Sequence, residues 1–431
     1  MTVKRGLMVA WAGVVTFAAL DLHAWVFPRR ETNLHIVREI GLFGYALYDL
    51  TTTAWHALVD DIDAVDAAPY RNFLQSRRET YRPRTAAAPE KSKKNVVFLQ
   101  HESMDAMTQD AKLDGEWVMP FYRGLRERAW VMENALDQTS VGRSSDCHVL
   151  VLTSQIPIQN EPIFTREDLS TIPSLPRVLH DHGYHSLSME GYQGEFWRWK
   201  LNHQRLGVDR SYDMTELDDS DMLGWGISDL SMVEQAVKLA AKSPRPFFAH
   251  VLMLTNHHPF EFVRESLGVP SGGIVRDYLV SVRYVDTVIQ RFYQRLAEAG
   301  LADSTIVAVY ADHDSGITEE LAQYLGRDYR PGAENERIPW MMTGLGAPRT
   351  VTRPAGLADL APTILDAVGL PIPEAFVGIP ISVERGDVLL PNGTHVTKIE
   401  GDLPTVESLA IDVKTLTRLA IHRSSALCGP P

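Results

Sequence analysis

The stretch Thr305-Ile306-Val307-Ala308-Val309-Tyr310-Ala311-Asp312-His313 joins an uninterrupted apolar run to an acid–imidazole pair. A short continuous apolar run is expected of a strand that is buried on both faces of a parallel sheet. Open α/β sheets gather their ligand chemistry at the carboxyl ends of their strands. Asp312 and His313 follow such an end, so the stretch predicts both the fold class and the edge of the sheet where function lies.

Two further apolar runs have strand length, at residues 95–100 and 247–254. A strongly amphipathic helix is predicted between the second run and residues 305–310, and Gly300 marks its end. The order strand, helix, strand implies a right-handed crossover. We therefore expect an α/β fold with a mainly parallel central sheet and helices on both faces. The apolar face of the predicted helix carries Tyr278, Val282, Val285, Ile289, Phe292 and Leu296.

The run at residues 95–100 is followed closely by Glu102, which adds a second carboxylate at a strand end. Glu102, Asp312 and His313 together form a ligand set suited to Mn²⁺, Mg²⁺ or Zn²⁺. An Asp-His pair alone is more simply explained as a hydrogen-bonded surface loop. The addition of a strand-end Glu and a hydroxyl-bearing loop favours a metal site, although the residues do not identify the metal.

That hydroxyl-bearing loop is Gln138-Thr139-Ser140-Val141-Gly142-Arg143-Ser144-Ser145-Asp146. A serine or threonine hydroxyl is barely ionised at neutral pH, so it becomes a good nucleophile only when a base or a metal ion activates it. An acid, a hydroxyl loop and an Asp-His pair therefore suit a metal ion that activates an alkoxide nucleophile.

In their order along the chain and in their local sequences, these motifs resemble the lipoteichoic-acid-synthase-like (phosphoglycerol transferase) branch of the alkaline phosphatase–sulfatase superfamily. That branch carries a Glu after its first strand, a Gly-Lys-Thr-Ser-Asp nucleophile loop and a late Asp-His. Here the loop departs twice, with Arg143 in place of Lys and Ser144 in place of Thr. The resemblance covers roughly residues 95–381, including a later stretch, Asp359-Leu360-Ala361-Pro362-Thr363-Ile364-Leu365.

The resemblance implies roles for single residues. Ser144 is the expected nucleophile and fourth metal ligand beside Glu102, Asp312 and His313, and Mn²⁺ is the favoured ion. Ser145 is the neighbour that competes for the nucleophile assignment. Helix N-terminal amides after the loop's glycine are suited to a phosphoryl oxygen. The candidates for binding substrate are Arg143, Trp197 and Arg198.

Two motifs describe the expected substrate pocket. In Asn256-His257-His258-Pro259-Phe260, His257 matches a histidine that touches the phosphate or leaving group, and its ordinary pKa suits proton transfer. Phe196-Trp197-Arg198-Trp199 resembles the family's Phe-Trp-Asn-Arg, but Arg198 falls at the Asn and Trp199 at the Arg. Glu190 stands where a histidine is common. Lys200 is an alternative to Arg198 as the cation.

The chain of 431 residues divides into five predicted regions. Residues 1–30 are a signal peptide or membrane anchor, because an apolar stretch flanked by Lys and Arg extends to the ~20 residues that span a bilayer. Residues 31–76 are a juxtamembrane helical segment, 77–94 a linker, 95–381 the sulfatase-like catalytic domain, and 382–431 its C-terminal extension. A turn is predicted at Asn392-Gly393 in the extension.

Composition limits the possible functions. The formal net charge of -13 argues against a nucleic-acid-binding protein, because phosphate contacts need clustered Lys and Arg. The two cysteines, Cys147 and Cys428, are too few for a disulfide framework or a zinc ribbon. We interpret Cys147, although it lies close to Ser144, as a small buried thiol.

We expect a membrane-associated phosphotransferase in the bacterial cell envelope, with its catalytic domain outside the cytoplasm. It would move a phosphoglycerol-type head group from an anionic phospholipid to a glycan or glycerol hydroxyl through a covalent seryl intermediate. A metal-dependent phosphodiesterase or sulfate-ester hydrolase is the alternative, although no Pro-x-Arg sulfatase pattern follows Ser144 or Cys147. A second metal would need more ligands, for which Asp314, His257 and Asp359 are candidates. A non-catalytic envelope protein is the third interpretation.

Overall fold

The computed structural model describes residues 62–79, 94–409 and 411–428. The predicted anchor and residues 31–61 of the predicted juxtamembrane segment lie outside the described residues. Within the described ranges, no helix is both long and apolar enough to cross a membrane. The chain is divided after Val65, and the fold below is that of the second unit, Asp66–Pro431.

The second unit is built around an eight-stranded sheet with the order β13-β4-β12-β11-β1-β10-β6-β7. Neighbouring strands are parallel except at β12, which runs antiparallel to both β11 and β4. The prediction of a mainly parallel α/β sheet is therefore confirmed. The strands are β1 (Asn95–His101), β4 (Trp130–Met132), β6 (His185–Glu190), β7 (Arg210–Tyr212), β10 (Phe247–Leu252), β11 (Thr305–Ala311), β12 (Trp340–Thr343) and β13 (Arg349–Val351).

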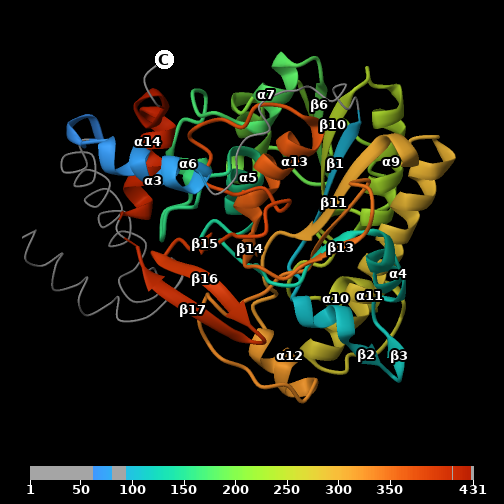
Figure 1. Ribbon diagram of the computed structural model, residues 1–431. Helices are drawn as coiled ribbons and strands as arrows, with labels where there is room; N and C mark the ends of the chain where they lie inside the picture. The colour runs from blue at the N-terminus through green and yellow to red at the C-terminus, as the bar shows by residue number, and fades with distance from the viewer. Residues whose placement is uncertain (1–61, 80–93, 410, 429–431) are drawn as a thin grey trace, which may run out of the picture. The chain divides into compact units, whose positions relative to one another are not determined.

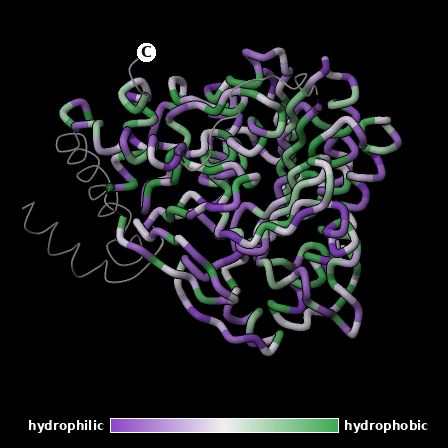
Figure 2. Tube along the Cα trace, viewed as in Figure 1, coloured by the Kyte–Doolittle hydropathy of each residue, from purple (hydrophilic) through white to green (hydrophobic). Residues whose placement is uncertain are grey.

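The three apolar runs of the sequence form the centre of this sheet. Every residue of β1, β10 and β11 is buried, which explains why their sequences lack the alternation of a half-exposed strand. The hydropathy colouring in Figure 2 follows the same pattern, with hydrophobic stretches along the central strands. The strand formed by the run at residues 247–254 is shorter than predicted. β10 ends at Leu252, and residues 253–254 belong to the loop that follows.

Helices cover both faces of the sheet (Figure 1). On one side lie α9 and α11, and α11 contains the predicted amphipathic helix with its apolar face buried. On the other side lie α5, α7 and α13, and α5 begins at the predicted nucleophile. The helices are α3 (Ala68–Glu79), α4 (Pro120–Leu125), α5 (Ser144–Thr153), α6 (Ile163–Arg166), α7 (Leu175–Asp181), α8 (Trp199–Arg205), α9 (Asp229–Lys242), α10 (Glu261–Ser266), α11 (Ile274–Glu298), α12 (Thr318–Tyr324), α13 (Leu360–Val368) and α14 (Val413–His422).

The C-terminal extension adds a three-stranded sheet of β15 (Val388–Leu389), β16 (Thr394–Glu400) and β17 (Leu403–Ser408). The predicted turn at Asn392-Gly393 connects β15 to β16, and Gly393 adopts the positive φ of 83° that this turn requires. Val388, Leu390 and Val396 pack with Leu136, which lies two residues before the nucleophile loop. The extension therefore supports the segment that leads into that loop.

Helix α3 packs against the same unit through arginine side chains. Arg77 is buried and donates to the carbonyl oxygen of Val377 at 2.8 Å and to a carboxylate oxygen of Asp387 at 2.5 Å. His395 also contacts the Asp387 carboxylate. The predicted linker therefore starts too early, because Arg77, Arg78 and Glu79 form the last turn of a packed helix. Residues 80–93 lie outside the described part of the chain.

We predict that Arg77→Met destabilises the fold by about 3 kcal/mol, because it leaves a largely buried carboxylate without its arginine partner. Burial raises the pKa of Asp387, but Arg77 and His395 outweigh that effect and lower it from 3.8 to about 2. A carboxyl whose pKa is lower in the folded than in the unfolded protein stabilises the fold at pH values above the unfolded pKa. This stabilisation is lost as the pH falls through the folded pKa. The stability difference between wild type and variant, measured by denaturant unfolding, should therefore shrink from about pH 4 to about pH 2.

The matched control is Arg78→Met on the same helix. Arg78 pairs with Glu374 at 2.8 Å, but the two side chains are 28% and 39% exposed, so its loss should cost less than about 1 kcal/mol. Equal losses in the two variants, or a difference that does not change with pH, would contradict the assignment.

Candidate active site

The register of β1 with β11 brings the two predicted carboxylates together. His101 pairs with Ala311 at the carboxyl ends of these parallel strands, so the next residues, Glu102 and Asp312, leave the sheet side by side. The backbone confirms this continuation, because the Asp312 amide donates to the carbonyl oxygen of His101 at 2.9 Å. In turn, the Ser103 amide donates to Asp312 Oδ1 at 2.9 Å, which orients the carboxylate.

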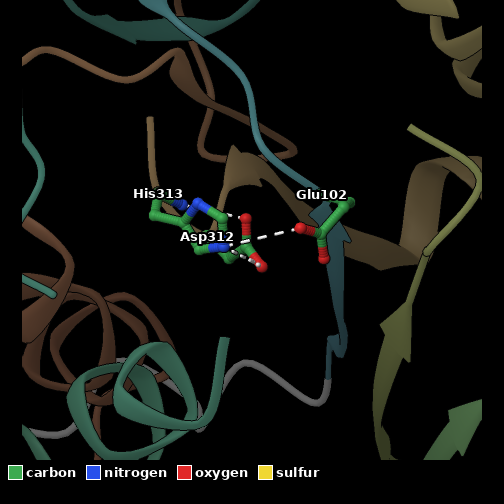
Figure 3. Close-up of side chains that lie close together, drawn as sticks. All are labelled: Glu102, Asp312 and His313. Atoms are coloured by element: carbon green, nitrogen blue, oxygen red, sulfur yellow. Dashed lines mark hydrogen bonds and ion pairs between the residues drawn. The ribbon is translucent and has the colours of Figure 1, made fainter. Parts of the chain in front are cut away.

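The imidazole of His313 completes a group of three convergent ligand atoms (Figure 3). One ligand atom from each of Glu102, Asp312 and His313 lies within 4.8 Å of the others, and all three residues are buried. His313 Nε2 is 3.5 Å from Glu102 Oε1 and 3.5 Å from Asp312 Oδ2. The structure therefore brings the three predicted ligand residues together.

The hydrogen bonds around this group fit a cation at its centre. His313 Nδ1 lies 2.7 Å from the carbonyl oxygen of Asp314, which assigns the ring proton to Nδ1 and leaves a lone pair on Nε2. Asp312 Oδ2 is buried without a hydrogen-bond donor among the described residues. Two carboxylates and a bare imidazole nitrogen facing one another repel, and a divalent cation bound by all three would remove that repulsion.

Burial and neighbouring negative charge shift the pKa values of Asp312 and His313. Burial, with the negative charge of Glu102, raises the pKa of Asp312 to about 6. Burial also lowers the pKa of His313, which keeps its ring neutral. Both pKa shifts favour the uncharged forms of these side chains, as expected of metal-ligand residues that have no cation beside them.

The nucleophile loop ends in a strained turn at the start of α5. Arg143 has φ 44° and ψ -116°, an unfavourable conformation for a residue with a side chain. Asp146 Oδ2 holds the turn by accepting from the amides of Ser140 at 2.9 Å and Gly142 at 3.0 Å. A β-carbon at Gly142 would lie only 2.2 Å from Asp146 Oδ1, so this closed turn requires glycine there. The turn fixes where the next residue points.

That next residue, Ser144, faces the ligand group. Its hydroxyl lies 3.4 Å from Glu102 Oε2 and 3.4 Å from His313 Nε2. Ser145 points elsewhere, because it is buried and its hydroxyl donates to the carbonyl oxygen of Gly142 at 2.8 Å. The geometry thus separates the two neighbouring serines, and it is Ser144 that lies beside the three predicted ligand residues.

Arg143 lies beside the site but is engaged by acidic residues. Its guanidinium is 3.3 Å from Asp314 Oδ2 and 4.0 Å from Asp137 Oδ2. Burial opposes the charge of Asp314, but Arg143 outweighs it and lowers the pKa of Asp314 to about 2. Burial and the neighbouring Asp314 raise the pKa of Asp137.

A second acidic group, Asp137 with Asp314 and Glu336, also has convergent oxygens. The Arg143 guanidinium already supplies positive charge there. Of the second-metal candidates from the sequence, Asp314 belongs to this second group, whereas His257 and Asp359 belong to neither group, and Asp359 pairs instead with Arg353 at 3.1 Å. Of the two groups in the described residues that could hold a metal ion, the one with an arginine ion pair is the second, so Glu102, Asp312 and His313 are the better candidates.

A cavity of about 410 Å³ opens onto Ser144. Of the predicted substrate-binding residues, Arg143 and Trp197 line it, whereas Arg198 does not. Arg198 is exposed, and Trp199 lines the cavity in its place. Lys200 is not free to replace Arg198, because it pairs with Asp213 at 3.0 Å and with Glu216 at 2.5 Å.

His257, the predicted proton donor, also lines this cavity. Its Nδ1 is 2.8 Å from the carbonyl oxygen of His258, so Nδ1 carries a proton and Nε2 is the nitrogen left to exchange one. The ring lies against Trp225, with centroids 4.5 Å apart. His258 lines the cavity as well, from an exposed position.

Glu190 and His148 also line the cavity, although the sequence predicted a role for neither. Glu190 ends β6, and burial together with Glu102 and Asp312 raises its pKa to about 8. His148 lies on α5, and its Nε2 is 3.3 Å from the side-chain amide of Gln100 on β1. Glu190 could have been found from its place at a strand end. His148 gave no signal, because a histidine in an apolar helix reads as core.

Comparison with known proteins assigns the family. The sulfatase family model matches residues 94–370. Lipoteichoic acid synthase 1 of Bacillus subtilis is 27% identical over 416 residues, covering 88% of this chain and 64% of that protein. Across the lipoteichoic acid synthase relatives, the chain spans between 54% and 64% of their length.

Solved structures share the fold. A lipoteichoic acid synthase of Listeria monocytogenes, LtaP, superposes with a TM-score of 0.69 at 21% identity, over 82% of this chain and 98% of that one. The phosphoglycerol transferase GacH of Streptococcus pyogenes, solved with sn-glycerol-1-phosphate, gives a TM-score of 0.51 at 13% identity, over 73% and 84%. The chain therefore belongs to the sulfatase family, in the lipoteichoic-acid-synthase-like branch of the alkaline phosphatase–sulfatase superfamily.

Proposed function

We propose that this protein is a metal-dependent phosphotransferase that moves a phosphoglycerol-type head group from an anionic lipid to a hydroxyl acceptor. The observation that carries the proposal is the convergence of Glu102, Asp312 and His313 on the hydroxyl of Ser144 at the start of α5. The curated relatives are named lipoteichoic acid synthases and one structural neighbour a phosphoglycerol transferase, which supports this donor chemistry. The acceptor is a glycan or glycerol hydroxyl.

Glu102, Asp312, His313 and Ser144 would hold the metal ion, for which Mn²⁺ is our first choice and Mg²⁺ or Zn²⁺ the alternatives. When bound, the ion supplies the positive field that stabilises a deprotonated hydroxyl and a phosphoryl oxygen. We place the catalytic domain outside the cytoplasm in the bacterial envelope, where its lipid substrate is found. The N-terminal anchor or signal peptide that would bring it there lies outside the described residues.

In the first step, Ser144 Oγ attacks the phosphorus as the alkoxide, the form in which the second step releases it, and the bond to the diacylglycerol oxygen breaks. His257 Nε2 protonates that oxygen, and a glycerophosphoryl-serine diester remains. In the second step, the acceptor hydroxyl gives its proton to His257 and displaces Ser144. Arg143, held by Asp314, adds positive charge at the cavity wall where phosphoryl oxygens develop charge.

We predict that the full chain, incubated with Mn²⁺ and a phosphatidylglycerol analogue without acceptor, gains one glycerophosphoryl unit on Ser144. Intact-mass analysis and peptide mapping would measure the adduct. Ser144→Ala should form none, while Ser145→Ala should keep the adduct because the Ser145 hydroxyl is turned toward Gly142. Release of free glycerophosphate without an adduct would favour the hydrolase, and no reaction with any phosphodiester or sulfate ester would favour a non-catalytic protein.

The metal is tested by its stoichiometry. We expect about one equivalent of Mn²⁺ to remain on the wild type after dialysis, and Asp312→Asn to weaken binding by about 100-fold or more because a charged ligand is lost. Asp314→Asn is the control, since Asp314 pairs with Arg143. Elemental analysis and a competition titration would measure both. Metal loss in Asp314→Asn with retention in Asp312→Asn would move the ion to the second acidic group.

His257 is tested by changing the leaving group. His257→Gln should slow transfer from a lipid donor by about 100-fold, because an alkoxide leaves poorly without a proton. An aryl phosphodiester, whose leaving group needs no proton, should be affected far less. His258→Gln controls for a change in cavity shape, since His258 lines the same wall. Equal slowing of both substrates by His257→Gln would remove the proton-donor role.

A further inference from the structure

Four aromatic rings form a continuous series at the mouth of the Ser144 cavity. We call Tyr192, Phe196, Trp197 and Trp225 the aromatic rim. Tyr192 is 5.4 Å from Phe196 and 6.2 Å from Trp225 between ring centroids, and Phe196 is 5.9 Å from Trp197. Phe196 and Trp197 also line the cavity, so the rim borders the entrance to the site.

The rim exposes apolar surface that the fold does not use. Phe196 is 43% exposed and Trp225 is 41% exposed, and Met222 in the same hairpin is 47% exposed. Large aromatic residues are ordinarily buried, and a contiguous exposed group of them marks a surface that contacts another apolar phase. A single exposed aromatic would need no such explanation.

The segments that carry the rim are held firmly. Trp225 sits in the hairpin of β8 (Met222–Leu223) and β9 (Gly226–Ile227). The Ile227 amide donates to the carbonyl oxygen of Gly191 at 2.9 Å, just after β6 ends. A β-carbon on Gly226 would lie 2.2 Å from that same oxygen, so the hairpin approaches the end of β6 as closely as glycine permits. The hairpin therefore holds Trp225 in a defined place beside the end of β6.

A free positive charge accompanies the rings. Arg198 is exposed and follows Trp197 directly, and its guanidinium makes no hydrogen bond or ion pair with the described residues. Lys200, two residues later, is by contrast neutralised by Asp213 and Glu216. Aromatic rings beside a basic residue are typical of protein surfaces that lie at the membrane–water interface.

We propose that the aromatic rim and Arg198 bind the surface of an anionic lipid bilayer, so that a lipid head group enters the cavity while its acyl chains stay in the membrane. This inference rests on the proposed lipid donor. Each methylene that leaves a bilayer for water adds to the cost of extracting a lipid. A rim that meets the bilayer avoids this cost, because only the head group has to reach Ser144. It also gives Arg198 a partner, a lipid phosphate outside the cavity.

Depth in the bilayer tests the proposal without turnover. The full chain, carrying Cys428→Ser, is reconstituted in vesicles of phosphatidylglycerol and phosphatidylcholine with a fluorophore on Trp225→Cys or Trp117→Cys. Trp117 is the matched control, because it is the same residue type and 38% exposed, and it lies on β3 (Glu116–Trp117). Nitroxide lipids should quench the label at position 225 at least about threefold more than the label at 117. Equal quenching at both positions overturns the proposal.

Activity separates the rim from the chemistry. We compare the rate on a donor in vesicles with the rate on a short-chain, water-soluble donor. Trp225→Ser and Arg198→Ala should lower the vesicle-to-soluble ratio by about tenfold, and Trp117→Ser should not change it. An unchanged ratio in active variants overturns the rim proposal alone. A wild type that reacts with neither donor overturns the proposed function, while the quenching experiment still decides the rim.

Discussion

Parallel pairing of β1 with β11 in a single register is the constraint on which the site depends. It places Glu102 next to Asp312 and carries His313 to the same point. A register slip of one residue would turn one strand's side chains to the opposite face of the sheet. The long buried strands make that slip costly, since each residue of β1 and β11 already fills the core. The hydrophobic interior thus fixes the geometry of a polar site.

The same edge of the sheet accumulates negative charge that the described residues only partly offset. Asp137 and Asp314 are compensated by Arg143, whereas Glu102 and Asp312 face a neutral imidazole. Burying unpaired charge costs several kcal/mol per group, so the cation that we propose for this site would also stabilise the folded protein. Binding of that cation and stability of the site are therefore two aspects of one equilibrium.

The sequence predicted the central strands, the amphipathic helix and the C-terminal turn, because each depends on local periodicity or on a local turn signal. It also placed the ligand residues at strand ends. What it missed depends on tertiary contacts. Asp146 gave no sign that it closes the nucleophile turn. The sequence showed that Arg198 and Trp199 are offset from the family's Phe-Trp-Asn-Arg pattern. It did not show which of the two side chains lines the cavity, because Trp197 and Arg198 both take positive φ, at 51° and 55°, and this redirects the side chains.

Gln138 shows how the end of the chain reaches the start of the nucleophile loop. Its side-chain amide donates to the carbonyl oxygen of Leu389 at 2.8 Å and accepts from the amide of Ala358 at 3.0 Å. The residue that anchors the loop is thus held by segments made more than two hundred positions later. A growing polypeptide cannot assemble this support until β15 has emerged from the ribosome. A product that ends before β15 would therefore lack this support for the nucleophile loop.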